Sequence, residues 1–365
     1  MNAYLPSPSP LLSRPGAVPA EGVDAGVAWH YGDPVAEQRR LEEGVGAVDL
    51  SHRGVVRITG PDRLDWMHAL TSQQLTGLAP EVSTETLVLS PHGHIEHAPH
   101  LVDDGEALWL GVEPGAAPEL ADWLDRMRFL LRVEVADVSA QYAVVGEPVG
   151  GPETAGAGEA SAERGTGDSP PDPGAVGAVA VWVDPWPARG PDTASYAAVG
   201  EDTHPGRHRR WREVILPRPR LAEYLDGRPL AGTWAAEALR VAAWRPRAGV
   251  DTDHRTIPHE LDWLRTAVHL HKGCYRGQET VARVHNLGHP PRRLVLLHLD
   301  GSENVLPGHG DPVMLDDRTV GQVTTAVRHH ELGPVALALV RRATPVPATL
   351  TVAGIPAAQE PVVAP

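Results

Sequence analysis

The sequence predicts an α+β protein that ends in a small all-β domain. In the first half of the chain, paired strand-like runs are interleaved with amphipathic helical runs, a pattern that differs from the strict strand–helix alternation of a parallel sheet. After Pro290-Pro291, short β-rich runs are separated by Gly and Asp turns, which is typical of an antiparallel barrel or sandwich. We therefore divide the chain into an α+β region, residues 27–288, and a C-terminal β-barrel domain, residues 289–360.

The N-terminal residues 1–26 are rich in proline and contain little to bury, which predicts a disordered segment. Folding is expected to begin near Val27. Asp33-Pro34 is a helix start, because Asp is a favoured N-cap and Pro is tolerated at the first helical position. We expect that helix to run to Glu43, where Gly44 ends it.

The periodicity of the following residues predicts strands and helices in turn. Apolar residues recur at helical spacing after Gly60-Pro61-Asp62, which predicts a helix there. A second helix is predicted over 118–131. Strands are predicted over 47–54, 55–59, 84–89, 94–102, 107–112 and 133–138.

Residues 147–176 break the pattern, since Gly, Ala, Pro and Glu dominate and nothing is periodic. Strand-like runs flank the segment, so we interpret it as a disordered insertion within a domain. A second loose region covers 189–210. Beyond it we predict a strand at 211–216, helices at 221–225 and 234–243 with Thr233 as cap, and barrel strands at 293–299, 312–315, 320–327, 335–341 and 349–352.

The formal charge of the chain is −15, from 32 Lys and Arg against 47 Asp and Glu. Such a chain is a poor general ligand for nucleic acid or anionic membrane, so we expect neither as a partner. Local basic groups at 207–210 and at Arg245 and Arg247 could still bind a small anion. A single cysteine excludes an intramolecular disulfide, and with no signal-like start the expected location is the cytoplasm.

One stretch carries reactive-looking chemistry: Lys272-Gly273-Cys274-Tyr275-Arg276-Gly277-Gln278-Glu279-Thr280. The thiol of Cys274 precedes a predicted helix start at Gln278 and has Lys272 and Arg276 nearby, surroundings that favour thiolate over thiol. Two structural alternatives exist. Cys274 could be a small buried hydrophobe in a tight turn, and Lys272 could hold a loop carbonyl.

This stretch resembles the K-G-C-[FY]-x-G-Q-E signature of the YgfZ-type folate-binding proteins, which are relatives of the glycine-cleavage T-protein, an aminomethyltransferase. The rest of the superfamily pattern is similar and in the same order over about residues 27–355. It includes Val48 to Gly54, Ile58 to Asp62, Gly93-His94-Ile95, Ala238 to Val241, Ile257 to Glu260, Val320 to Thr324 and Ala336 to Val340.

The resemblance implies a three-lobed T-protein fold, a monomer, and a bound tetrahydrofolate or one-carbon derivative in a central cavity. It also implies an accessory role in iron–sulfur cluster assembly or repair, with client or assembly proteins as partners. Three departures from the T-protein enzymes make turnover doubtful, because Ala98 and Ala242 replace acidic residues and Trp244 replaces a glycine. The alternatives are a folate-dependent aminomethyltransferase or demethylase, and a structural relative that has lost folate binding.

A pterin site needs a stacking surface, a carboxylate or amide for the ring edge, and a cation for the glutamate tail. In that implied site Cys274 and Lys272 would be the functional pair. The candidates for the folate are Trp234, with Trp66 and Trp244, for stacking, Glu260 or Glu279 for the ring edge, Arg240 for a carboxylate, and the motif residues Tyr275 and Gln278. Each has a structural alternative: Trp66 could be core, Arg240 could pair with an acid, and Gln278 and Glu279 could cap a helix.

Two groups of histidines are candidate metal ligands. His92, His94 and His100 would share one face of a strand near His97, and His269 and His271 precede the thiol. No HExxH pattern is present, and we predict no metal site. One thiol cannot hold an iron–sulfur cluster alone, so any cluster role of Cys274 must be transient, shared with a partner, or redox.

Overall fold

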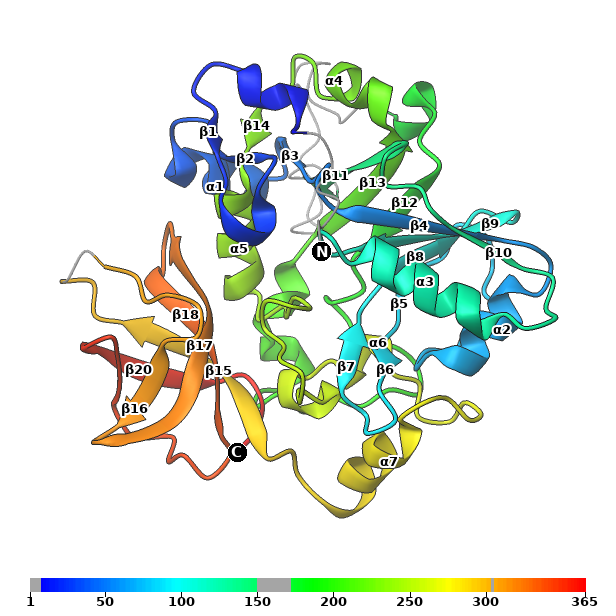
Figure 1. The fold of residues 1–365 in the computed structure, drawn as a ribbon. Coiled ribbons are helices and arrows are strands. Elements are labelled where there is room, and N and C mark those ends of the chain that lie inside the picture. Colours follow the sequence, from blue (N-terminus) through cyan, green and yellow to red (C-terminus); the bar gives the residue numbers. More distant parts are fainter. Residues whose placement is uncertain (1–7, 150–171, 303–304) are drawn as a thin grey trace, which may run out of the picture.

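The computed structural model describes residues 8–149, 172–302 and 305–365, and it forms three lobes (Figure 1). Two lobes are built on five-stranded sheets and the third is a closed barrel. The predicted α+β class with a C-terminal antiparallel barrel is thereby confirmed. The helices are α1 Pro34–Glu42, α2 Arg63–Leu70, α3 Ala117–Met127, α4 Leu221–Tyr224, α5 Thr233–Ala242, α6 Leu264–Ala267 and α7 Gln278–Leu287.

The first sheet is antiparallel throughout, in the order β10 (Glu134–Asp137), β4 (Gly54–Thr59), β9 (Ala107–Val112), β8 (His100–Asp103) and β5 (Ser83–Glu85). Helices α2 and α3 contribute Met67, Leu120 and Leu124 to the core that also holds Ile58 and Leu108 of the sheet. The apolar spacing read from the sequence therefore marks the buried faces of both helices correctly.

The second sheet has the order β12 (Ala180–Val183), β13 (Trp211–Pro217), β11 (Tyr142–Pro148), β3 (Ala47–Asp49) and β14 (Leu230–Ala231). Only the β3–β14 pair in this sheet is parallel. Glu37 of α1 joins this lobe to α5, because its carboxylate accepts hydrogen bonds from Tyr31 N at 2.7 Å and from Gly232 N at 2.9 Å. Gly232, and not the predicted Thr233, is thus the residue before α5.

The barrel closes in the order β15 (Arg292–Leu299), β18 (Gly333–Arg341), β17 (Arg318–His329), β16 (Pro312–Leu315), β19 (Leu350–Val352) and β20 (Ile355–Pro361). Val295, Val323 and Val340 belong to its buried interior. The five predicted strands are present. Strand β20 was missed because prolines at both ends disguise it, yet it pairs with β15 and β19 and closes the barrel.

The predicted strands 84–89 and 94–102 are each divided in two. Their outer parts, β6 (Val88–Leu89) and β7 (Ile95–His97), leave the first sheet and form a separate hairpin. Pro99 lies between β7 and β8 and has no N–H to donate to a ladder, which accounts for the break. The hairpin thereby projects toward the cysteine loop before α7 (Figure 1).

The prediction of disorder for residues 1–26 is wrong for residues 8–26, and residues 1–7 lie outside the described residues. Pro10 begins a short 3-10 helix, Pro10–Ser13, which Ser9 caps through its Oγ. Leu11 is only 2% exposed and enters the core beneath the second sheet. Strand β1 (Val18–Pro19) then pairs with β2 (Ala28–His30). Composition did not predict the order of residues 8–26, because a single buried side chain, that of Leu11, anchors the segment.

Most of the predicted insertion 147–176 also lies outside the described residues. Its edges are placed: β11 runs on to Pro148, and the 3-10 helix Pro173–Val176 buries Val176. The second loose region, 189–210, is ordered by the 3-10 helices Glu201–Thr203 and Pro205–His208. Within the described ranges, no helix combines the length and the hydropathy that crossing a bilayer requires.

The anchoring role of Leu11 can be tested by stability. Leu11→Ala should lower the free energy of unfolding by about 2–4 kcal/mol, because it removes buried methyl groups and leaves a cavity. Urea denaturation followed by circular dichroism measures the change. Val23→Ala, at a side chain that is 45% exposed, is the control and should change stability by less than about 0.5 kcal/mol. Equal stabilities for the wild type and Leu11→Ala would mean that this segment is not anchored in solution.

Candidate functional site

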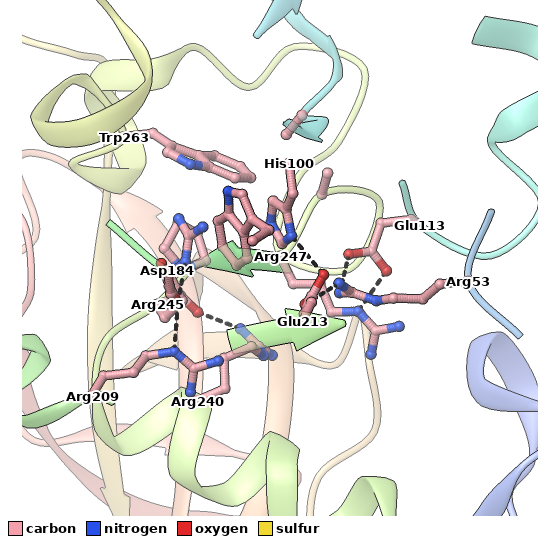
Figure 2. Close-up of a pocket in the computed structure, with 14 residues that line it drawn as sticks. Arg53, His100, Glu113, Asp184, Arg209, Glu213, Arg240, Arg245, Arg247 and Trp263 are labelled. Atoms are coloured by element: carbon pink, nitrogen blue, oxygen red, sulfur yellow. Dashed lines mark hydrogen bonds and ion pairs between the residues drawn. The ribbon is translucent and has the colours of Figure 1, made fainter. Parts of the chain in front are cut away.

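A cavity lined largely by charged side chains lies where the lobes meet (Figure 2). The side chains come from strands of both sheets and residues next to those strands, from α5 and the loop after it, and from Trp263 just before α6. The ionisable residues in the lining are Arg53, His100, Glu113, Asp184, Arg209, Glu213, Arg240, Arg245 and Arg247, and the lining also contains Trp182, Trp263 and Ala98.

The acids of the cavity are each held by arginine. Arg53 donates to Glu213 at 2.6 Å and to Glu113 at 2.8 Å, so it bridges the two sheets. Arg247 donates to the other oxygen of Glu113 at 2.7 Å. Asp184 accepts from Arg209 at 2.8 Å. Figure 2 shows two groups of pairs, one around Glu213 and Glu113 and one around Asp184.

The histidine of the cavity is also committed to the network. Nδ1 of His100 lies 3.0 Å from Glu213, and its ring stacks on Trp182 with the two ring centres 3.7 Å apart. Burial alone would raise the pKa of Glu213, but Arg53 and His100 lower it well below its ordinary value. Likewise, Arg245 and Arg209 overcome the effect of burial and lower the pKa of Asp184. Carboxylates held ionised in this way are poor proton donors.

The space left among these side chains is about 30 Å³. That volume accommodates a water molecule or two, whereas small-molecule sites usually offer about 300–1,000 Å³. A pterin ring therefore does not fit among these residues as they lie. Ala98 lines the cavity at a position where the resemblance places an acid, so the predicted loss of that carboxylate is seen at the site itself.

Arg240 was predicted to bind a ligand carboxylate, and the structure contradicts this. Its guanidinium donates to Glu237 through Nε at 2.9 Å and Nη2 at 2.8 Å, to Asp251 through Nη1 at 2.6 Å, and to Arg245 O and Thr325 as well. No N–H of this side chain remains available. The structural alternative, pairing with acids, is the correct one, because a buried guanidinium must be satisfied locally.

Glu260 was predicted for the pterin edge and is also committed elsewhere. It is fully buried and accepts hydrogen bonds from Arg292 at 2.9 and 2.8 Å and from Ile257 N at 3.2 Å. It joins the 3-10 helix Pro258–Leu261 to the barrel and lines neither cavity described for the molecule. Its role is to fix the orientation of the barrel.

The predicted stacking residues separate into core and surface. Trp66 is 4% exposed and donates to Met127 O at 3.3 Å, so it is part of the first core. Trp244 is 1% exposed with φ of 57°, a left-handed conformation that glycine adopts without strain, which accounts for the glycine expected there from the resemblance. Trp234 is half-buried and lines a separate groove.

The cysteine motif forms a loop held at both ends. Cys274 is exposed, so the alternative of a buried thiol is wrong. The Lys272 ammonium donates to the carbonyl of His68 in the last turn of α2, and to those of Thr71 at 2.5 Å and Gln73 at 2.9 Å beyond the helix end. Burial lowers the pKa of Lys272 to about 7. These contacts are the structural alternative named for Lys272, and its functional pairing with Cys274 stays a prediction.

The remaining motif residues shape the same loop. Gln278 begins α7 as predicted, and its Oε1 accepts from Tyr275 N at 2.9 Å. Tyr275 is half-buried against the core that includes α6, and its ring centre lies 5.1 Å from Nζ of Lys272. Glu279 is exposed in the first turn. Arg276 pairs with Glu96 of β7 at 2.7 Å. None of these side chains lines the central cavity.

The predicted histidine cluster is not assembled as a ligand set. His100 points into the ion-pair network, His97 is buried, and the rings of His92 and His94 lie 6.1 Å apart. His269 lies 3.4 Å from Asp192. Within the described ranges, only Glu42, His329 and His330 gather three ligand atoms of the kinds that bind metals. Nδ1 of His329 there accepts from two backbone N–H groups at 3.2 Å, which weakens it as a ligand.

Sequence reasoning missed most of the central network. The groups at 207–210 and at Arg245 and Arg247 were identified as cations for a small anion, and three of them do line the cavity. The terminal nitrogens of Arg209 donate to no side chain in the described part of the molecule. The acidic partners come from distant strands, so no local signal indicated them.

Two family descriptions match the chain. Residues 12–157 match the GCVT N-terminal domain, and residues 292–361 match the glycine cleavage T-protein C-terminal barrel domain. The solved structure of the glycine cleavage system aminomethyltransferase T from Bartonella henselae is similar with a TM-score of 0.70 and 17% identity, over 97% of this chain and 95% of that one. This three-lobed α+β fold with a terminal barrel is the fold of the T-proteins.

Curated relatives agree with that class. An aminomethyltransferase of Moorella thermoacetica is 28% identical over 92% of this chain and 90% of its own length. A putative chloroplastic transferase of Arabidopsis thaliana is 24% identical over 78% of this chain, but the match spans only 62% of the plant protein. The chain belongs to the glycine cleavage T-protein superfamily.

The two glycines of the cysteine motif provide a test of the loop geometry. Gly277 has φ of 84°, and a Cβ there would lie 2.5 Å from Ser90 O in the β6–β7 turn. Gly277→Ala should therefore lower the free energy of unfolding by more than about 2 kcal/mol. Gly273→Ala is the matched control, because a Cβ at Gly273 meets nothing within 4 Å. Urea denaturation of both variants measures the difference, and equal stabilities would contradict the described packing of the loop on the hairpin.

Proposed function

We propose that this chain is a YgfZ-type member of its superfamily: a protein that binds a reduced folate and supports iron–sulfur cluster assembly or repair through Cys274. The observation that carries the proposal is the state of the acids at the centre. Each carboxylate that lines the cavity is held by an arginine. In addition, Ala98 places a methyl group in the cavity at the position where the resemblance to T-protein enzymes predicts an acid. A site without a free general acid or base suits binding better than turnover.

The cysteine loop supports the second half of the proposal. Cys274 is exposed, while Lys272, Arg276 and Gln278 on either side of it are held by hydrogen bonds. A thiol fixed in this way loses little conformational freedom when a partner binds it. Because a cluster usually takes four thiolates, Cys274 would supply one ligand or one redox step, and a client or assembly protein would supply the rest.

The second candidate function is that of a folate-dependent aminomethyltransferase or demethylase. The relatives favour it, since those at 24–28% identity include several named aminomethyltransferase. Under this alternative, the protein would transfer a one-carbon group to or from tetrahydrofolate in vitro.

The predicted monomeric state and cytoplasmic location stay predictions, and the plant relative is named as chloroplastic.

Folate binding is tested by titrating the purified protein with tetrahydrofolate in an isothermal calorimeter. We expect saturable binding at sub-millimolar ligand, because a small ligand that combines a stacked ring with a charge-paired tail can reach that affinity. Glutamate alone is the control ligand and should give no saturable heat at the same concentrations. Absence of saturation by tetrahydrofolate would remove both the accessory proposal and the transferase alternative.

The role of the thiol is tested in cells whose only copy of the gene carries Cys274→Ser. Several iron–sulfur enzymes should lose at least about half of their activity while the abundance of the variant stays normal, because the exposed thiol contributes nothing to the core. A matched variant, Ser302→Ala, changes an exposed side chain of the barrel and should have no effect. Unchanged iron–sulfur enzymes in the Cys274→Ser strain would refute the cluster role, and folate-dependent one-carbon transfer by the purified protein would favour the alternative.

A further inference from the structure

The turn that follows α3 exposes three consecutive large apolar side chains, which we call the apolar turn. Phe129 is 87% exposed, Leu130 99% and Leu131 43%. Within the described ranges, the next most exposed large apolar side chain is Val305, at 57%. Single exposed apolar side chains are ordinary on a protein surface, whereas a contiguous group of them is typical of an interaction site.

The apolar turn is exposed because α3 ends before it. The sequence predicted a helix over 118–131, but α3 ends at Met127. Phe129 has φ of 46°, a left-handed conformation that is costly for an aromatic residue. A backbone in this conformation cannot continue a right-handed helix, so residues 129–131 leave the helix and turn their side chains to solvent.

The apolar turn is held in place at both ends in spite of its exposure. The guanidinium of Arg132 donates to the carboxylate of Asp62, next to the start of α2, at 2.6 and 3.1 Å, and the backbone N–H of Arg132 donates to it at 2.9 Å. On the other side, the indole N–H of Trp66 donates to Met127 O at 3.3 Å. An apolar surface that is fixed in advance loses little conformational freedom when a partner binds it.

The cysteine loop is attached to the same two helices. The Lys272 ammonium donates to His68 O in the last turn of α2, and the guanidinium of Arg276 lies over the ring of Trp123 on α3, 5.5 Å from its centre. Helix α2 has eight residues, so its two ends are about 12 Å apart. The apolar turn is bonded at one end of α2 and the cysteine loop at the other. Figure 1 shows α2, α3 and α7 on the side of the molecule away from the barrel.

The apolar turn and the thiol of Cys274 fit within one interface of ordinary size. A standard protein–protein interface covers about 800 Å² of each partner, which corresponds to a patch about 30 Å across. A protein that reaches the exposed thiol can therefore also cover the apolar turn. Trp123 and Arg276 lie between the two, and Trp and Arg are the residue types most enriched at the energetic centres of interfaces.

The charges beside the apolar turn favour a protein over a membrane as the occupant. Residues 117–132 carry three arginines and three acids. Arg128 pairs with Asp125 at 3.1 Å, and Arg132 pairs with Asp62 at 2.6 Å. Such a balance gives no surplus of positive charge for anionic lipid headgroups. An apolar recess in a protein, by contrast, accommodates apolar side chains without requiring a net charge.

We propose that the apolar turn is the docking surface for the protein that supplies the remaining cysteine ligands of the iron–sulfur cluster served by Cys274. Phe129 and Leu130 enter an apolar recess of that partner, and its cysteines thereby come to face Cys274. This inference rests on the proposed role of Cys274 in iron–sulfur maintenance and names the surface through which the partner is recognised.

The docking surface is tested in cells whose only copy of the gene carries Leu130→Asp. Several iron–sulfur enzymes should lose at least about half of their activity while the abundance of the variant stays normal, because a charge placed in an apolar recess is costly. Leu130→Met keeps the apolar surface and should behave as the wild type does. The matched control is Val305→Asp, which places the same charge at an exposed site before the barrel strand β16 and should have no effect.

Two further measurements separate docking from an effect on the thiol itself. Purified Leu130→Asp should react with dithiobis(nitrobenzoate) at Cys274 at a rate within about twofold of the wild type, because the substitution leaves the cysteine loop unchanged. In cells, Leu130→Asp combined with Cys274→Ser should lower the iron–sulfur activities no further than Cys274→Ser alone, because both changes block the same step. A rate changed by about tenfold or more, or a clearly greater loss in the double variant, would contradict the proposal.

The comparison with Cys274→Ser separates the docking surface from the proposed function. If Cys274→Ser lowers the iron–sulfur activities and Leu130→Asp leaves them normal, the docking assignment is wrong and the proposed function stands. If neither variant lowers them, the proposed function fails, and the docking assignment with it. Co-sedimentation of the wild type, but not of Leu130→Asp, with vesicles of phosphatidylglycerol and phosphatidylcholine would show that the turn binds a membrane and would overturn the assignment of a protein partner.

Discussion

The structure depends on a buried ion-pair layer that joins all three lobes. Arg247 alone contacts Asp24 of the N-terminal segment, Glu113 at the end of β9 and Glu237 of α5. Arg240 extends the layer toward the barrel, where Thr324 and Thr325 donate to the Asp251 carboxylate at 2.5 and 2.7 Å. Because isolated buried charges are costly, every member of such a layer needs its partners in place at once. The relative positions of the lobes follow from that requirement.

The same layer accounts for the chemistry of the centre. In a small cavity with five arginines and three carboxylates, each carboxylate is paired with at least one arginine, and these partners lower the pKa values of Glu213 and Asp184. The space that a ligand would need is occupied by the guanidinium groups themselves. A larger space, of about 640 Å³, lies on the other side of the layer, beside Trp29 and Trp234.

Features with a local physical cause could be predicted from the sequence. Asp33-Pro34 begins α1, and the helix after Gly277 begins at Gln278, because capping and backbone conformation are decided by neighbours in the chain. The roles of Arg240 and Glu260 could not be predicted, since their partners are set by tertiary packing: Asp251 and Thr325 for one, and Arg292 for the other. Leu11 was missed for the same reason, as the core that receives it is formed by residues about 40 to 200 positions away.

The bonds between Asp251, Arg240 and β17 have a mechanical consequence. Asp251 follows α5 in the chain, and its two oxygens are divided between the barrel threonines and the Arg240 and Arg247 side. To swing away from α5, the barrel would have to break these bonds together and expose an arginine–aspartate pair to solvent. These bonds therefore hold the barrel in a fixed position against α5. The width of a molecule that can enter from this side is set by the rigid arrangement of α5 and the barrel, and not by movement at a hinge.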